Sequence, residues 1–304
     1  MSLKLTILGC HSSTPRSDTH PSAQILEIKN HTFLIDCGEG TQMQLRKYKI
    51  SFAKINHIFI SHLHGDHFFG LIGLLSSFGL LGIKKVVHIY GPKGIKKAIE
   101  TLMEISQSHK TYEIIFHELS NEEPEVIFSD NNVEVQTIPL NHRTYTNGFL
   151  FKEKPSLLNL DIKAIERYPE IEKCDYYRIK NGEDFTLSDG TIIKNKKLTL
   201  PPKHLMSYAY CSDTSFYPTI IPQIYKVDLL YHEATFLEEH LELAIKTGHS
   251  TAIQAATIAK KAKVNQLIIG HFSNRYQKKG LFLKEAKTVF ENIQLAEEGK
   301  CYEV

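Results

Sequence analysis

The sequence of 304 residues predicts a layered α/β protein. Short apolar or alternating segments typical of β-strands recur along the chain, and segments of helical composition separate many of them. A chain of this length also buries a large core, as one large domain or two ordinary ones. It contains no run of about 18 apolar residues that could span a bilayer. Residues 1–9 lack the basic start and cleavage site of a signal peptide, so we expect a cytoplasmic protein.

The individual elements follow from local patterns. An alternating segment with β-branched residues that ends at Gly9 predicts a strand. Two strand patterns on either side of Lys29 and Asn30 predict a hairpin. Gly91 with Pro92 predicts the start of a helix. We expect strands at residues 3–8, 23–28, 32–36, 57–61, 86–90, 112–119, 132–138, 148–152, 206–211, 228–231 and 266–269. We expect helices at residues 41–49, 68–81, 91–106, 250–261 and 283–292.

One long segment, residues 153–203, does not fit this alternation. It is charged, rich in proline, and carries only a short helical stretch at residues 158–168 and a hairpin signal around Ser188, Asp189 and Gly190. A stretch of this length with little core pattern is typical of a functional insertion or a mobile arm. We therefore expect an arm inserted into the α/β domain.

The cysteine positions and the net charge give little information about function. The five cysteines are far apart and form no CxxC pair, so we expect reduced thiols and neither disulfides nor a thiolate zinc site. The formal net charge of +2 is too small to indicate a nucleic-acid partner by itself. The sixteen histidines are the compositional anomaly, and their positions matter more than their number.

The strongest chemical signal is residues 61–67, SHLHGDH, directly after a predicted buried strand. His62 and His64, two apart on extended chain, can point to one metal ion, whereas Asp66 and His67 follow the bend at Gly65 and can point to a second. Imidazole and carboxylate groups are suitable ligands for zinc. A structural zinc site more often includes cysteine and closes its coordination, so this cluster indicates a catalytic metal site.

Further ligands follow other predicted strands. His142 lies in the loop after one strand, Asp213 follows the strand that ends at Cys211, and His271 follows another. Each alone has an ordinary interpretation, since loop histidines are usually solvated and an aspartate after a strand often caps a helix. In this order after HxHxDH, the three indicate a metal centre.

The ordered set of seven residues resembles the metallo-β-lactamase superfamily over nearly the whole chain. The resemblance implies one domain spanning residues 1–304, folded as a four-layered αβ/βα sandwich with two zinc ions per subunit. The implied ligands of one ion are His62, His64 and His142. Those of the other ion are Asp66, His67 and His271, and Asp213 bridges the two.

Within the superfamily, four motifs resemble the ribonuclease Z family. They are residues 8–15 (LGCHSSTP), 36–42 (DCGEGTQ), 232–235 (HEAT) and 249–251 (HST). The resemblance implies a zinc-dependent endoribonuclease that cleaves 3′ extensions from tRNA precursors and leaves a 3′-hydroxyl on the tRNA. It also implies a homodimer, and a tRNA-binding role for the arm at residues 153–203.

The resemblance assigns catalytic roles to three residues. Asp66 holds the attacking water and accepts its proton. His249, supported by Glu233, donates a proton to the leaving 3′-oxygen, because a histidine held by a carboxylate has the orientation and pKa that general acid catalysis requires. The alternative for His249 is a capping or supporting role, and His232 is expected to orient ligands.

The arm departs from the family pattern, because residues 168–177 contain no Gly-Pro, although residues 179–183 and 187–190 do resemble the family's arm. Candidate phosphate contacts, each of which could instead belong to a solvated helix face, are Lys84, Lys85, Lys93, Lys96, Lys97, Lys194, Lys196, Lys197, Lys260, Lys261, Lys278 and Lys279. Two alternatives stay open. One is a hydrolase of a small phosphodiester or other ester-like substrate. The other is a non-catalytic RNA-binding relative, which the complete ligand set disfavours.

Overall fold

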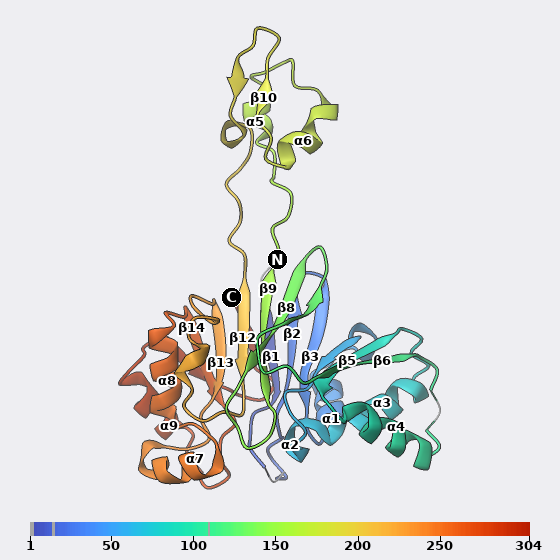
Figure 1. The fold of residues 1–304 in the computed structure, drawn as a ribbon, viewed down its shortest axis with the longest axis vertical. Helices are drawn as coiled ribbons and strands as arrows, with labels where there is room; N and C mark the ends of the chain where they lie inside the picture. The colour runs from blue at the N-terminus through green and yellow to red at the C-terminus, as the bar shows by residue number, and fades with distance from the viewer. Residues whose placement is uncertain (1–2, 14–15, 109) are drawn as a thin grey trace. The chain divides into compact units, whose positions relative to one another are not determined.

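The computed structural model describes residues 3–13, 16–108 and 110–304, and the chain divides into two compact units. The main unit comprises Met1–Glu153 and Met206–Val304, and the arm comprises Lys154–Leu205. In the main unit two seven-stranded sheets face each other, and helices cover both outer faces (Figure 1). This four-layered αβ/βα arrangement is the predicted fold. In the described residues no helix is long and apolar enough to cross a membrane.

The first sheet has the strand order β16-β1-β2-β3-β4-β5-β6. The predicted hairpin is confirmed, because β2 and β3 pair antiparallel and turn at Lys29 and Asn30. Strands β3 to β6 run parallel. The strands are β1 (Lys4–Gly9), β2 (Ala23–Ile28), β3 (His31–Cys37), β4 (His57–Phe59), β5 (Val87–Pro92), β6 (Ile114–Leu119) and β16 (Cys301–Glu303).

The second sheet has the strand order β15-β14-β13-β12-β9-β8-β7. Its half from β12 to β15 is parallel, and its half from β7 to β12 is antiparallel. The strands are β7 (Val126–Ser129), β8 (Val133–Pro139), β9 (Asn147–Glu153), β12 (Ser207–Cys211), β13 (Leu229–Glu233), β14 (Gln266–Gly270) and β15 (Ile293–Leu295).

Helices lie on the outer face of each sheet (Figure 1). Those beside the first sheet are α1 (Thr41–Lys47), α2 (Gly65–Phe68), α3 (Gly70–Leu80) and α4 (Ile95–Ile105). Those beside the second sheet are α7 (Leu241–Thr247), α8 (Ala252–Lys261) and α9 (Gly280–Lys287). Short 3-10 helices are η1 (Phe52–Lys54), η4 (Pro218–Ile220) and η5 (Glu238–His240). Helix α8 begins with a capping box in which the Thr251 hydroxyl accepts from the Gln254 N–H.

Three predicted helices were wrong in detail. Gly91 and Pro92 do not open a helix but end β5, paired with β6, and α4 starts only after Gly94, whose φ of 103° makes the turn. The predicted helix at residues 68–81 is interrupted at Phe69, between α2 and α3. Helix α9 ends at Lys287 rather than residue 292, because the chain must reach β15, which starts at Ile293.

Two hydrophobic clusters hold the main unit together. The larger lies between the sheets and includes Phe33, Phe59 and Phe151, whose rings pack at centroid distances of 5.4–5.5 Å. The smaller packs α3 and α4 on the first sheet through residues such as Leu75 and Phe78. Each fully buried side chain of this kind contributes about 1.5–3 kcal/mol, so this core holds the strand ends that carry the site in place.

The arm has a small core of its own, made by Ile165, Ile171, Ile179, Ile193 and Leu198. The predicted hairpin is confirmed, because β10 and β11 pair antiparallel on either side of Ser188–Gly190. The predicted helix at residues 158–168 shrinks to the four residues of α5, and α6 was not predicted. The elements are α5 (Ile162–Ile165), η2 (Lys173–Asp175), α6 (Tyr176–Lys180), β10 (Phe185–Thr186), β11 (Ile192–Ile193) and η3 (Asn195–Lys197).

Candidate metal centre

The HxHxDH segment leaves the end of β4 and turns into α2. His62 to His64 is extended chain, with His64 at φ −71° and ψ 146°, and the helix that starts at Gly65 aims Asp66 and His67 in another direction. The start of α3 is fixed against the turn after β3, since a Cβ at Gly70 would lie 2.0 Å from the Gly38 carbonyl oxygen. Glycine at position 70 therefore allows the close packing that holds this loop.

The remaining predicted ligands come from the second sheet. His142 follows β8, Asp213 follows β12 and His271 follows β14. Strands β12 and β14 are parallel to each other through β13, so their carboxyl ends lie at one edge of the sheet. His271 has a φ of 60°, a left-handed conformation that is uncommon for a non-glycine residue and occurs often at functional sites.

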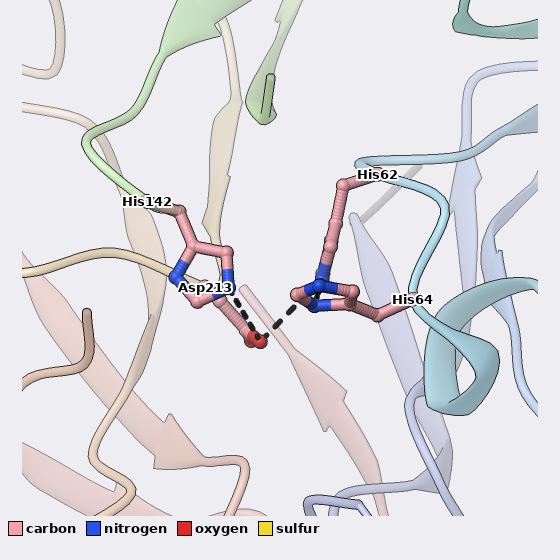
Figure 2. A group of neighbouring side chains, drawn as sticks. All are labelled: His62, His64, His142 and Asp213. Atoms are coloured by element: carbon pink, nitrogen blue, oxygen red, sulfur yellow. Dashed lines mark hydrogen bonds and ion pairs between the residues drawn. The ribbon is translucent and has the colours of Figure 1, made fainter. Parts of the chain in front are cut away.

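The first ligand cluster contains His62, His64, His142 and Asp213, whose ligand atoms all lie within 4.8 Å of one another. Figure 2 shows the two histidines of the HxH segment facing His142 and Asp213 from the opposite side. Asp213 Oδ2 is 3.6 Å from His62 Nε2 and 4.0 Å from His142 Nε2. His62 Nε2 and His64 Nδ1 are 2.9 Å apart.

The second cluster contains Asp66, His67 and His271. Asp66 Oδ2 lies 3.7 Å from His67 Nε2 and 3.4 Å from His271 Nε2. Asp213 contributes its other oxygen here, with Oδ1 3.4 Å from His67 Nε2 and 3.2 Å from His271 Nε2. The structure thus brings all seven predicted ligands together, with one oxygen of Asp213 facing each cluster.

The ring nitrogens in these clusters fit metal ions better than they fit one another. His142 Nε2 is buried and has no hydrogen-bond partner among the described residues. His67 Nε2 and His271 Nε2 face each other at 3.2 Å. Buried polar atoms normally have hydrogen-bond partners. A bound cation would supply the missing partner where ring nitrogens and carboxylate oxygens converge. These clusters could therefore bind metal ions.

Neighbouring groups fix the orientation of the ligand rings through their second nitrogens. His67 Nδ1 lies 2.7 Å from Asp36 Oδ2, His142 Nδ1 donates to the Gly248 carbonyl at 2.7 Å, and His271 Nδ1 lies 2.9 Å from Thr235 Oγ1. Such contacts set the tautomer and direct Nε2 towards a metal. Sequence reasoning missed the roles of Asp36 and Thr235, although both belong to motifs that it had singled out.

The clustered charges shift the pKa values of the ligands. Burial alone would lower the pKa of His67, but the carboxylates of Asp213, Asp36 and Asp66 raise it to about 10. Burial would raise the pKa of Asp213, yet His271 and His67 hold it well below its ordinary value. Histidine ligands bind metal in the neutral form, so an ion in these clusters would take the place of such a proton.

His249 and Glu233 form a pair next to the two clusters. His249 Nδ1 lies 2.8 Å from Glu233 Oε1, and its ring centroid is 5.1 Å from that of His142 and 5.4 Å from that of His271. Burial would lower the pKa of His249, but Glu233 and Asp213 raise it to about 9. His232 is fully buried and its Nδ1 donates to the Glu233 carbonyl at 2.7 Å.

The predicted N-terminal motif also reaches the site. Ser13 N–H donates to Asp66 Oδ2 at 2.7 Å. Thr14 and Pro15 of the same motif lie outside the described residues.

Relatives named ribonuclease Z resemble nearly the whole chain. Ribonuclease Z of Bacteroides fragilis is 47% identical over 298 residues and covers 98% of each chain. Ribonuclease Z of Bacteroides thetaiotaomicron is 46% identical over 300 residues, covering 98% of this chain and 94% of that one. The chain belongs to the ribonuclease Z family. The predicted family and the predicted type of enzyme, an endoribonuclease, are thereby confirmed.

Solved structures and a family model also match the chain. The structure of human tRNase Z, short form (ELAC1), has a TM-score of 0.72 and 27% identity, and covers 98% of each chain. The metallo-β-lactamase fold protein YhfI of Bacillus subtilis has a TM-score of 0.71 at 20% identity, which supports the fold alone. Residues 3–170 also match the family model described as "Anti-Pycsar protein Apyc1", which places this part of the chain in that family too. Asp213 and His271 lie beyond that match, whereas the ribonuclease Z relatives cover them.

Proposed function

We propose that the chain removes 3′ extensions from tRNA precursors with two zinc ions in this centre. Water attacks the phosphorus, the bond from phosphorus to the 3′-oxygen breaks, and the tRNA keeps a 3′-hydroxyl while the extension keeps the phosphate. Family membership supports the tRNA substrate. The observation that carries the two-metal chemistry is the placement of Asp213, which directs Oδ2 towards His62 and Oδ1 towards His271.

The ligands would divide between the ions as the two clusters divide. One ion would be held by His62, His64 and His142, the other by Asp66, His67 and His271, with Asp213 shared. Zinc suits this set, because imidazole and carboxylate ligands without thiolate are typical of catalytic zinc sites. Bound zinc ions supply Lewis acidity towards phosphoryl oxygens and lower the pKa of water.

Asp66 would orient the attacking water and accept its proton. Its Oδ2 is already fixed by the Ser13 N–H at 2.7 Å and faces His271 at 3.4 Å. In this proposal Oδ1 would contact the water. Asp66 then combines the roles of ligand and base, so its replacement should remove both.

His249 would protonate the leaving 3′-oxygen. Glu233 holds its Nδ1 and is itself fixed by three donors, namely the N–H groups of Thr214 and Thr235 at 2.9 and 3.0 Å and the Thr235 hydroxyl at 2.6 Å. The ring therefore keeps one orientation, with Nε2 available to substrate. A positioned histidine acid of this kind contributes about 10²–10⁴-fold to rate.

The arm, residues 153–203 as predicted from sequence, would bind the body of the tRNA. Its separate core gives it the stability to act as a contact surface. Lys194 is paired with Asp184 at 2.9 Å, so Lys196 and Lys197 are the better candidates for phosphate contacts. The homodimer rests on the family resemblance and the cytoplasmic location on the N-terminal sequence, and both stay predictions.

Cleavage of a 3′-extended tRNA precursor tests this function. We would map the cut made by the wild type, by Asp66→Ala, and by chelator-treated protein before and after zinc is restored. A control variant, Asp130→Ala, breaks a carboxylate–imidazole pair with His31 outside the metal centre. The proposal expects a single cut beside the discriminator nucleotide, absent in Asp66→Ala and after chelation, and retained in Asp130→Ala.

A different result would redirect the assignment. Absence of tRNA cleavage, together with metal-dependent hydrolysis of bis-(p-nitrophenyl) phosphate, would keep the metal centre and overturn the tRNA substrate. A small phosphodiester would then be the better candidate. Cleavage that survives exhaustive chelation would overturn the metal chemistry itself.

A further inference from the structure

A second group of metal-ligand atoms lies outside the centre described above, where the loop after β1 meets the loop before β16. Cys10 Sγ, a ring nitrogen of His11 and a carboxylate oxygen of Glu298 all lie within 4.8 Å of one another. Cys10 is fully buried, His11 is 7% exposed, and the Glu298 side chain is 13% exposed. None of the three residues belongs to the seven predicted ligands.

In the part of the chain that the structure describes, His11 Nδ1 has only one distant polar partner, the carboxylate of Glu298. This nitrogen is buried, has no hydrogen-bond partner among the described residues, and lies 3.6 Å from Glu298 Oε1, beyond hydrogen-bond distance. The ring packs against Phe272 at a centroid distance of 6.2 Å. A buried ring nitrogen without a close partner, beside a carboxylate and a thiol, is an arrangement that a bound cation would satisfy.

Glu298 is already held in a ligating position. Its Oε2 lies 2.8 Å from His20 Nδ1 and accepts from Gln44 Nε2 at 3.0 Å. Its Oε1 accepts from the His20 N–H at 2.7 Å and has a second lone pair for the side of His11. Metal-binding carboxylates are commonly fixed by such outer contacts.

We propose that Cys10, His11 and Glu298 bind one further transition-metal ion, of the zinc class, separately from the catalytic centre, in contrast to the expectation from cysteine spacing alone. Thiolate, imidazole and carboxylate are all zinc ligands, and the thiolate disfavours magnesium and calcium. The Cys10 thiol now donates to the Ala296 carbonyl at 3.4 Å. On binding, its proton leaves to solvent, a sulfur–metal bond forms, and water takes the fourth position.

An ion at this position would stabilise the loop that contacts Asp66. Residues 10–13 form the loop that brings the Ser13 N–H to Asp66 Oδ2. An ion on Cys10 and His11 would tie that loop to the segment carrying Glu298. The inference does not depend on the proposed tRNA substrate, because the ion binds outside the catalytic ligands.

Cobalt(II) provides a specific test, because the catalytic ligands are all nitrogen or oxygen and only a cysteine gives thiolate-to-cobalt charge-transfer absorption. Metal-free full-length protein would be titrated with cobalt chloride and followed in the near ultraviolet. We expect a thiolate band in the wild type and in Cys301→Ser, a control at an exposed cysteine. We expect its loss in Cys10→Ser and a cobalt affinity at least about tenfold weaker in His11→Ala.

Two results would overturn the site. One is the absence of a thiolate band in the wild type at excess cobalt. The other is a band of unchanged intensity and affinity in Cys10→Ser or His11→Ala. If Cys10→Ser does not fold, as judged by circular dichroism, the His11→Ala titration decides alone, because that variant leaves the thiol in place.

Discussion

His249 Nδ1 lies 2.8 Å from Glu233 Oε1, in a pair that borders both ligand clusters. Glu233 is fully buried, and the backbone N–H groups of Thr214 and Thr235 fix both of its oxygens. The carboxylate therefore cannot turn away from the ring. This rigidity is what a histidine needs if it is to deliver a proton to one atom of a substrate.

Glu233→Gln should lower kcat on precursor tRNA by about 10²-fold while leaving KM nearly unchanged. The acid must be protonated, so activity is lost as pH rises through the pKa of His249, which Glu233 helps raise to about 9. Removing that charge should move the alkaline loss of activity to lower pH. A pH–rate profile measures this, and an unchanged alkaline limb would contradict the role of the pair.

Tyr210→Phe should weaken both stability and metal binding. The Tyr210 hydroxyl donates to Asp36 Oδ2 at 2.6 Å, and the same oxygen orients His67. Loss of this hydrogen bond should cost about 1–3 kcal/mol of unfolding free energy. It should also weaken zinc affinity about tenfold.

Tyr208→Phe is the matched control for Tyr210→Phe, because Tyr208 lies on the same strand and donates to Gln24 instead. We expect Tyr208→Phe to lower stability and leave zinc affinity unchanged. Urea denaturation and competition with a zinc-binding dye measure the two quantities. Equal zinc affinity in both variants would argue against Asp36 as an orienting group.

Acid should destabilise the fold partly through His57. Burial, and then the neighbouring His88 and His31, lower the pKa of His57 to about 4. In the unfolded state His57 takes up its proton near pH 6.5, but in the folded state only near pH 4. The stability of the fold that depends on neutral His57 is therefore fully present above pH 6.5 and is lost as the pH falls to 4.

His57→Phe keeps an aromatic ring beside His88, where the imidazole now stacks at 4.8 Å. When the pH is lowered from 6.5 to 4, the free energy of unfolding should fall by about 1 kcal/mol less in this variant than in the wild type. This figure allows for partial solvent screening of His57. Urea denaturation across that range measures the difference. Parallel curves would show that His57 is not responsible.

Removal of the arm should separate tRNA binding from chemistry. Ser207 pairs with Lys152 across antiparallel strands β12 and β9, so residues 154–205 can be replaced by a tight Asn-Gly turn without moving the main sheet. We expect the shortened protein to hydrolyse bis-(p-nitrophenyl) phosphate at the wild-type rate and to cleave precursor tRNA at least about tenfold less efficiently. Undiminished tRNA cleavage would exclude a binding role for the arm.

The sequence predicts which residues lie together at the candidate site, but it misses several of the smaller elements. Asp213 and His271 are far apart in the chain, yet each follows a predicted strand, and parallel pairing through β13 brings these strand ends to one edge. His62 follows a predicted strand of the other sheet. The edge strands β7, β15 and β16 were missed, because strands of three or four residues form through pairing with a neighbour and carry little pattern of their own.

Asp36 shows a second limit of sequence reasoning. Its carboxylate accepts from the Ser61 N–H, the Ser61 hydroxyl and Tyr210, as well as contacting His67. These partners lie up to 174 positions away along the chain. Pairing of β3 with β4 places Ser61 beside Asp36, and packing of the second sheet adds Tyr210. The motif alone therefore does not reveal the network.

The zinc content of Asp213→Asn shows whether one carboxylate serves both metal ions. The carboxylate directs one oxygen to each cluster, so its replacement should remove at least one zinc ion per chain relative to the wild type and abolish precursor cleavage. Asp130→Asn, at the carboxylate–imidazole pair with His31, should keep the wild-type zinc content. Elemental analysis after gel filtration measures this. If Asp213→Asn retained the full zinc content and cleaved precursor tRNA at the wild-type rate, the shared carboxylate would have no part in the centre.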